Sequence, residues 1–452
     1  MKLPRKVLQT EGDVNISERR QEWQAGHISE EAFRLLDEDA ELYVHQSMST
    51  PCLNVVEKSY GIYIEDIDGR AYMDFHGNSA HQVGYGNEYV IQAVKKQLDL
   101  LPFSPRRYTN RAAIDLAKKL TSLAPGSLNK VLFAPGGTSA LSMALKLVRK
   151  ATGKFKTISM WDSFHGASLD AISVGGDADF RNGMGPLLPG TIHVPPYNSY
   201  RSEFGGSNTA FSTLDYIEYI LERENEVGAI ILEPVRCTDV QIPPRSYHQR
   251  LRSICDQYDV KLIYDEIPTG LGRTGKMFTF EHYGVEPDIV LLGKGLGGGV
   301  FPMAAMLARE DLDIAQDISL GHFTHEKSSL GCAAGLACIE YIEEQELLLH
   351  TVQMENFMKN RLNSMAEKYP LIGDIRGVGL LYGVELVKNQ ETKEKATAEA
   401  EEIMYECMTN GLSFKVSQGN VLTLAPPLII TEAELEQAMQ VLEAAISKVV
   451  TT

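Results

Sequence analysis

Between residues 130 and 310, short apolar runs alternate with stretches of helical periodicity. Several of the runs are apolar without interruption, which is expected where helices cover both faces of a mostly parallel sheet. The pattern therefore predicts an α/β fold built around one such sheet. The candidate strands are 130–134, 157–160, 191–194, 228–232, 261–264, 289–292 and 303–308.

The regions on either side of residues 130–310 do not show this alternation of apolar runs and helical stretches. Residues 1 to about 45 are polar and charged, and a helical stretch at 29–43 predicts an extension that packs on the body or on a partner subunit. Asp68-Gly69 is typical of a hairpin turn between two short strands. A long helix is expected at 331–344. We expect three segments: an N-terminal extension with a small-domain segment (1–75), a large domain (76–345) and a C-terminal small domain (346–452).

Composition excludes several classes of function. The formal net charge of -17, without a basic run, argues against binding to nucleic acid. No apolar segment approaches the length of a signal-peptide core or a membrane span, so we expect no membrane contact and a cytoplasmic location. The six cysteines show no Cys-x-x-Cys pair and no nearby histidine at zinc-ligand spacing. No metal site is predicted, and reduced thiols are expected.

Lys294 ends an apolar run and is followed by four glycines within residues 295–299. Such a loop lets the backbone approach a bound group closely. The preceding apolar run, 262–264, ends in Asp265. Pyridoxal phosphate needs a lysine for its Schiff base and an acid that keeps its pyridinium nitrogen protonated. The pattern indicates Lys294 and Asp265 as the catalytic pair.

Glycine-rich loops after strands also bind nucleotides, and a lone lysine at a strand end is often only a solvated cation. No Gly-x-Gly-x-x-Gly opens an early strand-helix unit here, as a dinucleotide-binding fold requires. Gly293-Lys294 also lacks the arrangement of a phosphate-binding P-loop. The loop by itself leaves the Schiff-base site and the solvated lysine both open.

Further motifs follow or accompany the predicted strands. They resemble the motifs of the class III aminotransferases. This family is the ornithine and omega-amino-acid branch of the fold-type I pyridoxal phosphate enzymes. The resemblance covers nearly the whole chain beyond about residue 45. It implies a large domain whose seven-stranded, mostly parallel sheet lies between helices, with a smaller α+β domain. The segments that carry the resemblance are 133–140, 161–166, 233–234, 265–270, 321–324 and 376–385.

The resemblance assigns the cofactor contacts residue by residue. The segment 136–138 places backbone amides at a helix N-terminus, which is an anion site suited to the cofactor phosphate. The ring of Phe164 resembles the family's aromatic residue that stacks on the pyridine. A threonine at position 324 resembles the one that reaches the phosphate of a neighbouring subunit, which implies a homodimer with shared active sites, possibly part of a larger assembly. The implied cofactor-binding residues are Gly136, Gly137, Thr138, Phe164, His165, Glu233, Asp265, Lys294 and Thr324.

Gly136 and Ser139 stand where the family usually has a serine and a glutamate, and two further departures from the family pattern bear on the reaction. Pro268 stands where the family usually has a glutamine that reaches the cofactor, and proline cannot donate that hydrogen bond. Thr423 stands where ornithine-type transaminases carry an arginine that holds a keto-acid carboxylate. Paired arginines instead follow Pro105, where a doubly charged phosphonate is a suitable ligand. The candidate substrate residues are Arg106, Arg107, Tyr108 and Arg376.

These departures bear on the reaction. Lys294, once released from the cofactor, can remove a proton from the carbon that bears the amine. The chain most resembles the lyase subgroup that eliminates ammonia from 1-hydroxy-2-aminoethylphosphonate and yields phosphonoacetaldehyde, a step of phosphonate catabolism. A transaminase of 2-aminoethylphosphonate or another omega-amine with a 2-oxo acid is the alternative. A regulatory pyridoxal-binding protein is a third interpretation, but the sequence shows no appended binding module.

Overall fold

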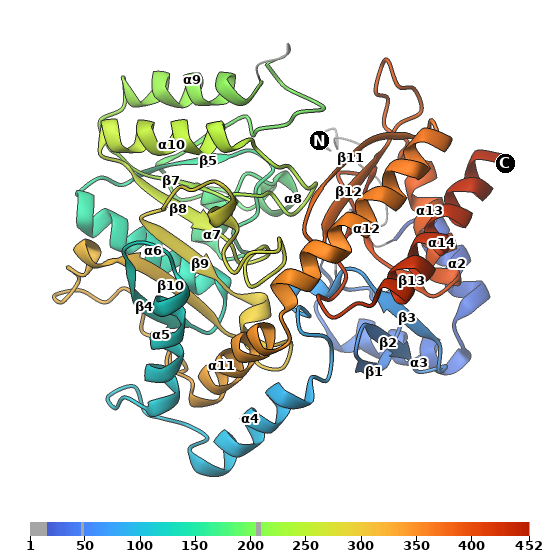
Figure 1. The fold of residues 1–452 in the computed structure, drawn as a ribbon, viewed down its shortest axis with the longest axis horizontal. Coiled ribbons are helices and arrows are strands. Elements are labelled where there is room, and N and C mark those ends of the chain that lie inside the picture. Colours follow the sequence, from blue (N-terminus) through green and yellow to red (C-terminus); the bar gives the residue numbers. More distant parts are fainter. Residues whose placement is uncertain (1–15, 47–48, 205–208, 452) are drawn as a thin grey trace.

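A computed structural model describes residues 16–46, 49–204 and 209–451. The large domain contains seven strands: β4 (Leu128–Ala134), β5 (Lys156–Met160), β6 (Thr191–Val194), β7 (Val227–Leu232), β8 (Lys261–Asp265), β9 (Ile289–Leu292) and β10 (Ala304–Arg309). They form one sheet in the order β4-β10-β9-β8-β7-β5-β6 (Figure 1). β10 is antiparallel to β4 and β9, whereas the pairs from β9 to β6 are parallel. The predicted mostly parallel sheet is therefore confirmed.

The apolar strands are buried from both sides because helices cover both faces of this sheet. Ile230 and Ile231 are neighbours in β7, yet they enter two separate apolar cores. The smaller core also contains Leu141 and Val148, which lie in the helix that packs on β10, β4, β7 and β9. The helices of this domain are α4 (Glu88–Leu100), α5 (Arg111–Leu123), α6 (Gly137–Thr152), α7 (Leu169–Val174), α8 (Ala178–Arg181), α9 (Thr209–Leu221), α10 (Arg245–Tyr258) and α11 (Ser329–Glu344).

A second, smaller domain follows α11. Its sheet is antiparallel throughout, with strand order β11-β12-β15-β14. The strands are β11 (Ile372–Val378), β12 (Leu381–Leu386), β14 (Lys415–Ser417) and β15 (Val421–Leu424). The helices are α12 (Leu347–Lys368), α13 (Thr397–Thr409) and α14 (Glu432–Thr451), which lie to one side of the large domain in Figure 1. Among the helices within the described ranges, none combines the length and the apolar character needed to cross a membrane.

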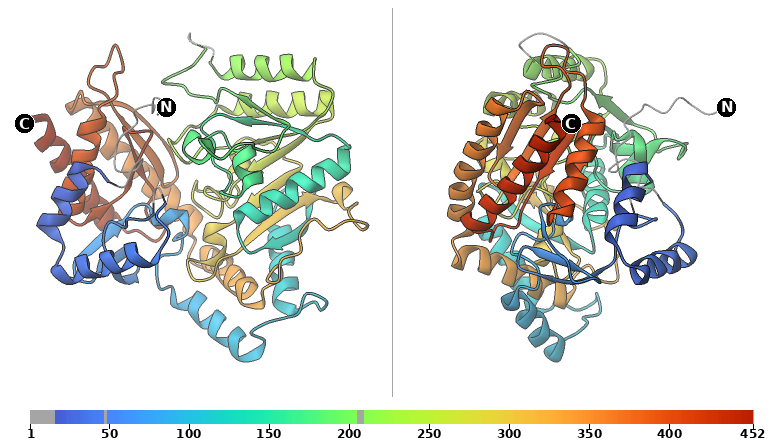
Figure 2. Two further views of the ribbon diagram at one scale, coloured as in Figure 1. Left: turned by 180° about the vertical axis from the view of Figure 1, so that it is seen from behind. Right: turned by 90° about the vertical axis from the view of Figure 1, so that its right-hand side faces the viewer.

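The N-terminal segment joins the smaller domain (Figure 2). Trp23 is buried, and its Nε1 donates to Thr409 Oγ1 at 3.2 Å. The short strand β13 (Leu412–Ser413) pairs in parallel with β3, so Leu412 lies opposite Met73. These contacts support the boundaries near residues 75 and 345, which we propose for the domains. The N-terminal elements are α2 (Glu18–His27), α3 (Glu30–Leu42), β1 (Val56–Tyr60), β2 (Tyr63–Asp66) and β3 (Ala71–Asp74).

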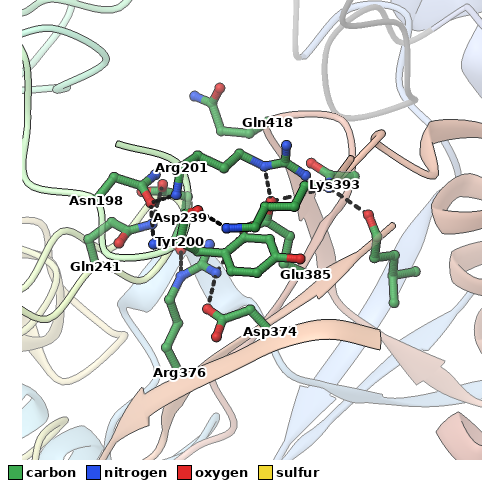
Figure 3. A network of polar contacts seen from close by, with 12 residues as sticks. Asn198, Tyr200, Arg201, Asp239, Gln241, Asp374, Arg376, Glu385, Lys393 and Gln418 are labelled. Carbon is green, nitrogen blue, oxygen red and sulfur yellow. Dashed lines mark hydrogen bonds and ion pairs between the residues drawn. The ribbon is translucent and has the colours of Figure 1, made fainter. Parts of the chain in front are cut away.

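A buried network of charges links the two domains (Figure 3). Arg376 on β11 places Nη1 2.8 Å from both Asp374 and Glu385, while its Nε donates to the Asp239 carbonyl oxygen at 2.9 Å. Arg201, from a loop of the large domain, also pairs with Glu385. The Arg376 and Glu385 side chains are only 8% and 3% exposed. Each charge is therefore compensated by its partners, and the network fixes the small domain against the loops that follow β6 and β7.

Replacement of one partner should destabilise this contact strongly. We expect Arg376→Met to lower the free energy of unfolding of the holoenzyme by about 3–5 kcal/mol, because it leaves Glu385 buried with fewer partners. Urea denaturation followed by circular dichroism measures the change. Lys388→Met is the matched control, since Lys388 forms an exposed pair with Glu394 at 3.2 Å. That pair should contribute less than about 1 kcal/mol. Equal small losses in both variants would contradict the role given to the network.

Candidate active site

A cavity of about 1000 Å³ lies between the large sheet and the small domain. Strands β4, β5, β7, β8 and β9 run in one direction, so the residues that follow them meet at a single edge of the sheet, where open α/β folds bind ligands. The opposite wall includes residues of β14 and β15. Eight of the nine predicted cofactor contacts line this cavity: Gly136, Gly137, Thr138, Phe164, His165, Glu233, Asp265 and Lys294.

Lys294 is the first residue of a short 3-10 turn that follows β9. Its backbone has φ +46°, a left-handed conformation that is unfavourable for a lysine and that commonly occurs at functional sites. The side chain is exposed to the cavity although its neighbours on both sides are buried. Gly295 must be a glycine, because a Cβ there would overlap the amide of Gln82. The glycine-rich loop thus presents one amine to the cavity.

Asp265 ends β8 and forms the floor of the site beside His165. Asp265 is 2% exposed, and its Oδ2 lies 2.8 Å from His165 Nδ1. Its Oδ1 accepts from the Ile267 amide at 3.1 Å. Each oxygen of the Asp265 carboxylate thus has a polar partner, His165 Nδ1 for one and the Ile267 amide for the other. An acid fixed in this way fits the residue that would bind the pyridine nitrogen of pyridoxal phosphate.

The N-terminus of α6 offers a cradle for an anion. Its N-cap, Gly136, supplies no side-chain cap, and the first amides of a helix have no partner within the helix. A Cβ added at Gly137 would lie 2.6 Å from Ile267 Cδ1, and one at Gly166 would overlap Thr138 Oγ1. Glycines at positions 137 and 166 therefore leave the backbone without side chains where the cavity meets the N-terminus of α6. The uncapped amides and the threonine hydroxyl fit the phosphate of pyridoxal phosphate.

Glu233 follows β7 and is buried near Asp265 and Lys294, the predicted catalytic residues. Its Oε2 accepts from the Cys237 amide at 2.9 Å. Burial, followed by the nearby Asp265 carboxylate, raises the pKa of Glu233 to about 7. The neighbouring Glu266 accepts from the Thr279 and Phe280 amides at 2.6 and 2.7 Å, and burial raises its pKa to about 8. Near neutral pH, the carboxyl groups of Glu233 and Glu266 are therefore readily protonated.

The polar residues of the cavity wall that were not predicted include His76, Asp177 and Lys415. His76 and Asp177 come from loops of the first half of the chain, and Lys415 comes from β14. Burial lowers the pKa of His76 to about 4 and raises that of Asp177 to about 6. A signal for Lys415 was present in the sequence, because Gly419-Asn420 is a hairpin turn between two short alternating runs. The turn places Lys415 beside Thr423.

Five predicted residues do not line the cavity of this chain: Arg376, which is described below, and four others. Arg106 Nε is 3.9 Å from Glu326 Oε1, and Arg107 is exposed. Tyr108 is 63% exposed, and Thr324 is also at the surface. A single chain therefore does not bring them to Lys294. Their roles stay predictions that require a second subunit.

The other positions singled out in the sequence divide into two groups. Pro268 and Thr423 line the cavity, so the two departures from the family pattern both face the site. Arg376 does not line it, and its guanidinium contacts the carboxylates of Asp374 and Glu385 instead. These contacts favour a structural role for Arg376 over the predicted contact with substrate.

Comparisons with known proteins agree with this geometry. Residues 44–446 match the family model described as aminotransferase class-III. The (R)-1-hydroxy-2-aminoethylphosphonate ammonia-lyase of Vibrio splendidus (strain 12B01) is 52% identical over 459 residues, or 98% of this chain and 96% of that protein. The leucine/methionine racemase of Thermococcus litoralis is 36% identical over 87% of this chain and 91% of its own length. The omega transaminase from Pseudomonas jessenii in complex with PMP superposes with a TM-score of 0.87 at 29% identity, covering 92% and 98% of the two chains.

The raised pKa of Glu233 predicts a pH dependence of stability. Its folded-state pKa of about 7 lies above the ordinary value of 4.5, so the folded protein binds more protons than the unfolded chain between these values. The stabilisation from Glu233 is then complete below about pH 4.5 and is lost as the pH rises through about 7. We expect Glu233→Gln to flatten the fall in Tm of the cofactor-free protein across this window, measured by calorimetry. A parallel fall in both proteins would show that Glu233 ionises normally.

Proposed function

This chain belongs to the class III aminotransferase family, and we propose that it is an ammonia-lyase acting on a small primary amine that carries a phosphonate. The proposed substrate is 1-hydroxy-2-aminoethylphosphonate, and the products are phosphonoacetaldehyde and ammonia. The observation that carries the proposal is Thr423, which faces the cavity where ornithine-type transaminases hold a 2-oxo acid with an arginine. The lyase from Vibrio splendidus, 52% identical over 98% of this chain, supports the same reaction.

Pyridoxal 5'-phosphate is the cofactor, and residues of the large domain would hold it. We assign its phosphate to the uncapped amides at the start of α6 and to Thr138. The ring of Phe164 would cover one face of the pyridine. Asp265, held by His165 at 2.8 Å, would bind the protonated pyridine nitrogen. When bound to an amine, the cofactor withdraws electrons from the carbon that bears nitrogen.

The side chains of this chain then move one proton. Lys294 Nζ takes the proton from the carbon that bears the amine, and hydroxide leaves the carbon that bears the phosphonate. The resulting Lys294 ammonium can donate this proton to the departing hydroxide, which then leaves as water. Glu233, with its pKa of about 7, limits the negative charge that builds up beside Asp265. One water is lost in the elimination and one is consumed in hydrolysis of the released enamine, so the net products are the aldehyde and ammonia.

Transamination of 2-aminoethylphosphonate or another omega-amine with a 2-oxo acid is the second candidate. The omega transaminase from Pseudomonas jessenii, which superposes with a TM-score of 0.87, favours it. Both reactions begin with the same proton transfer to Lys294. They differ in whether a leaving group is expelled or the proton is returned to the cofactor.

We also propose that the active unit is a homodimer. Apart from Arg376, four predicted site residues lie outside the cavity of their own chain: Arg106, Arg107, Tyr108 and Thr324. They could act on cofactor or substrate only across a subunit interface.

We also propose a cytoplasmic location, on other grounds. All six cysteines are unpaired thiols, which suits a reducing compartment.

Ammonia release without an acceptor distinguishes the two reactions. We expect the holoenzyme to release ammonia and aldehyde in equal amounts over many turnovers from racemic 1-hydroxy-2-aminoethylphosphonate with no 2-oxo acid present. A transaminase stops after one half-reaction under these conditions. Turnover that begins only when pyruvate or 2-oxoglutarate is added would replace the lyase by the transaminase.

The control for this assay is Lys294→Ala. This variant should release no ammonia above background and should lose the visible absorption of lysine-bound cofactor, while its far-ultraviolet circular dichroism stays unchanged. Full activity in the variant would remove Lys294 from the mechanism, whichever reaction is observed.

A further inference from the structure

The small domain supplies a cation to the wall that faces the cofactor cradle. Lys415 lies directly opposite Thr423 in the antiparallel pair of β14 and β15. Directly opposed residues project from the same face of a sheet, and both of these line the cavity that also contains Lys294 and Asp265. The position where the family arginine is missing therefore has a lysine as its cross-strand neighbour.

Thr423 itself is held in place by neutral contacts. Its Oγ1 lies 3.2 Å from the Thr238 carbonyl oxygen and 3.1 Å from Ser417 Oγ. Ser417 lies two residues after Lys415 on the same strand, so its contact with Thr423 shows that this face of β14 points toward the cavity wall. Thr423 and Ser417 offer hydroxyl groups only. The charge on this patch comes from Lys415.

Two titratable groups of the large-domain side face Lys415 across the cavity. His76 faces the same cavity, but burial lowers its pKa to about 4, so it is neutral near pH 7. Asp177 is the acid opposite, at the N-cap of α8, where it accepts from the Asp179 amide at 3.0 Å. Burial raises the pKa of Asp177 to about 6, and the charge of Lys415 opposes that rise. The ammonium of Lys415 thus acts on groups across the cavity.

Other cations are less well placed for an anion at the site. Arg106 and Arg107 do not line this chain's cavity, and Arg376 is committed to Asp374 and Glu385. Arg20 does line it, but its Nη2 donates to the Pro51 carbonyl oxygen at 2.8 Å, and burial lowers its pKa.

We propose that Lys415 binds the phosphonate of the substrate and takes over the anion-binding task that an arginine at position 423 performs in ornithine-type transaminases. The inference rests on the proposed function for the identity of the anion. The point charge of an ammonium can bind any oxygen of a tetrahedral dianion, whereas a planar carboxylate is better matched by the fork of an arginine. Lys415 would thereby select phosphonates over 2-oxo acids.

Binding of a phosphonate that has no amine tests the proposal without turnover. Isothermal titration calorimetry of the holoenzyme with ethylphosphonate should show that Lys415→Met weakens the affinity by about 10- to 100-fold, the loss expected for one charge-assisted hydrogen bond. Lys415→Arg should retain most of the affinity. Lys388→Met, which removes an exposed charge from the same domain, should bind as the unaltered enzyme does. In turnover, Lys415→Met should raise the KM for the hydroxyphosphonate while leaving the spectral reaction with propylamine unchanged.

Three results would overturn the assignment. One is equal affinity for ethylphosphonate in Lys415→Met and the unaltered holoenzyme. Another is loss of binding in an Arg106→Gln/Arg107→Gln double variant with full binding in Lys415→Met. The third is an unaltered holoenzyme that does not bind ethylphosphonate at all. If the holoenzyme releases no ammonia, the proposed lyase activity is wrong. The role of Lys415 in anion binding is then decided by the calorimetric comparison alone.

Discussion

The common direction of five strands is the constraint on which the site depends. β4, β5, β7, β8 and β9 all end at one edge of the large sheet, so segments far apart in the sequence converge without long connections. Each strand is held by apolar contacts on both faces, which makes the edge rigid. Lys294 and Asp265 are carried by adjacent strands, and His165 meets Asp265 from a third. The relative positions of Lys294, Asp265 and His165 therefore follow from the packing of the sheet.

The large domain alone forms only part of the cavity. The other wall comes from β14 and β15, whose position depends on the buried charges around Arg376 and Glu385 and on the parallel pairing of β13 with β3. A buried ion pair contributes little net stability, but removal of one partner is costly, so such a network specifies one relative position of the domains. This gives a physical reason for an arginine of the small domain to be buried rather than directed at substrate.

Charge is distributed unevenly around the cavity. The buried acids of the large-domain wall have different hydrogen-bond partners. Asp265 is supported by His165 and a backbone amide, whereas the pKa of Glu233 is raised to about 7. On the opposite wall, Lys415 supplies a positive charge within a chain whose net charge is -17. The residues proposed to hold the cofactor and the lysine proposed to bind an anion thus lie on opposite walls. This arrangement suits a substrate with an amine at one end and a phosphonate at the other.

The class of the fold and the strands of the large sheet could be predicted from the sequence alone, because they follow from local apolar runs. The eight predicted cofactor contacts that line the cavity were found in the same way, from motifs at strand ends. The sequence could not place Arg376, since the carboxylates that bind it come from a neighbouring strand and its own. Nor could it show that Arg106 and Arg107 lie away from the cavity of their own chain. Lys415 was missed because the turn at Gly419-Asn420 indicates a hairpin, but the register that puts Lys415 opposite Thr423 is defined only by the paired strands. Local pattern fixes which residues end a strand, whereas the residues that face each other across a cavity are decided by the packing of two domains.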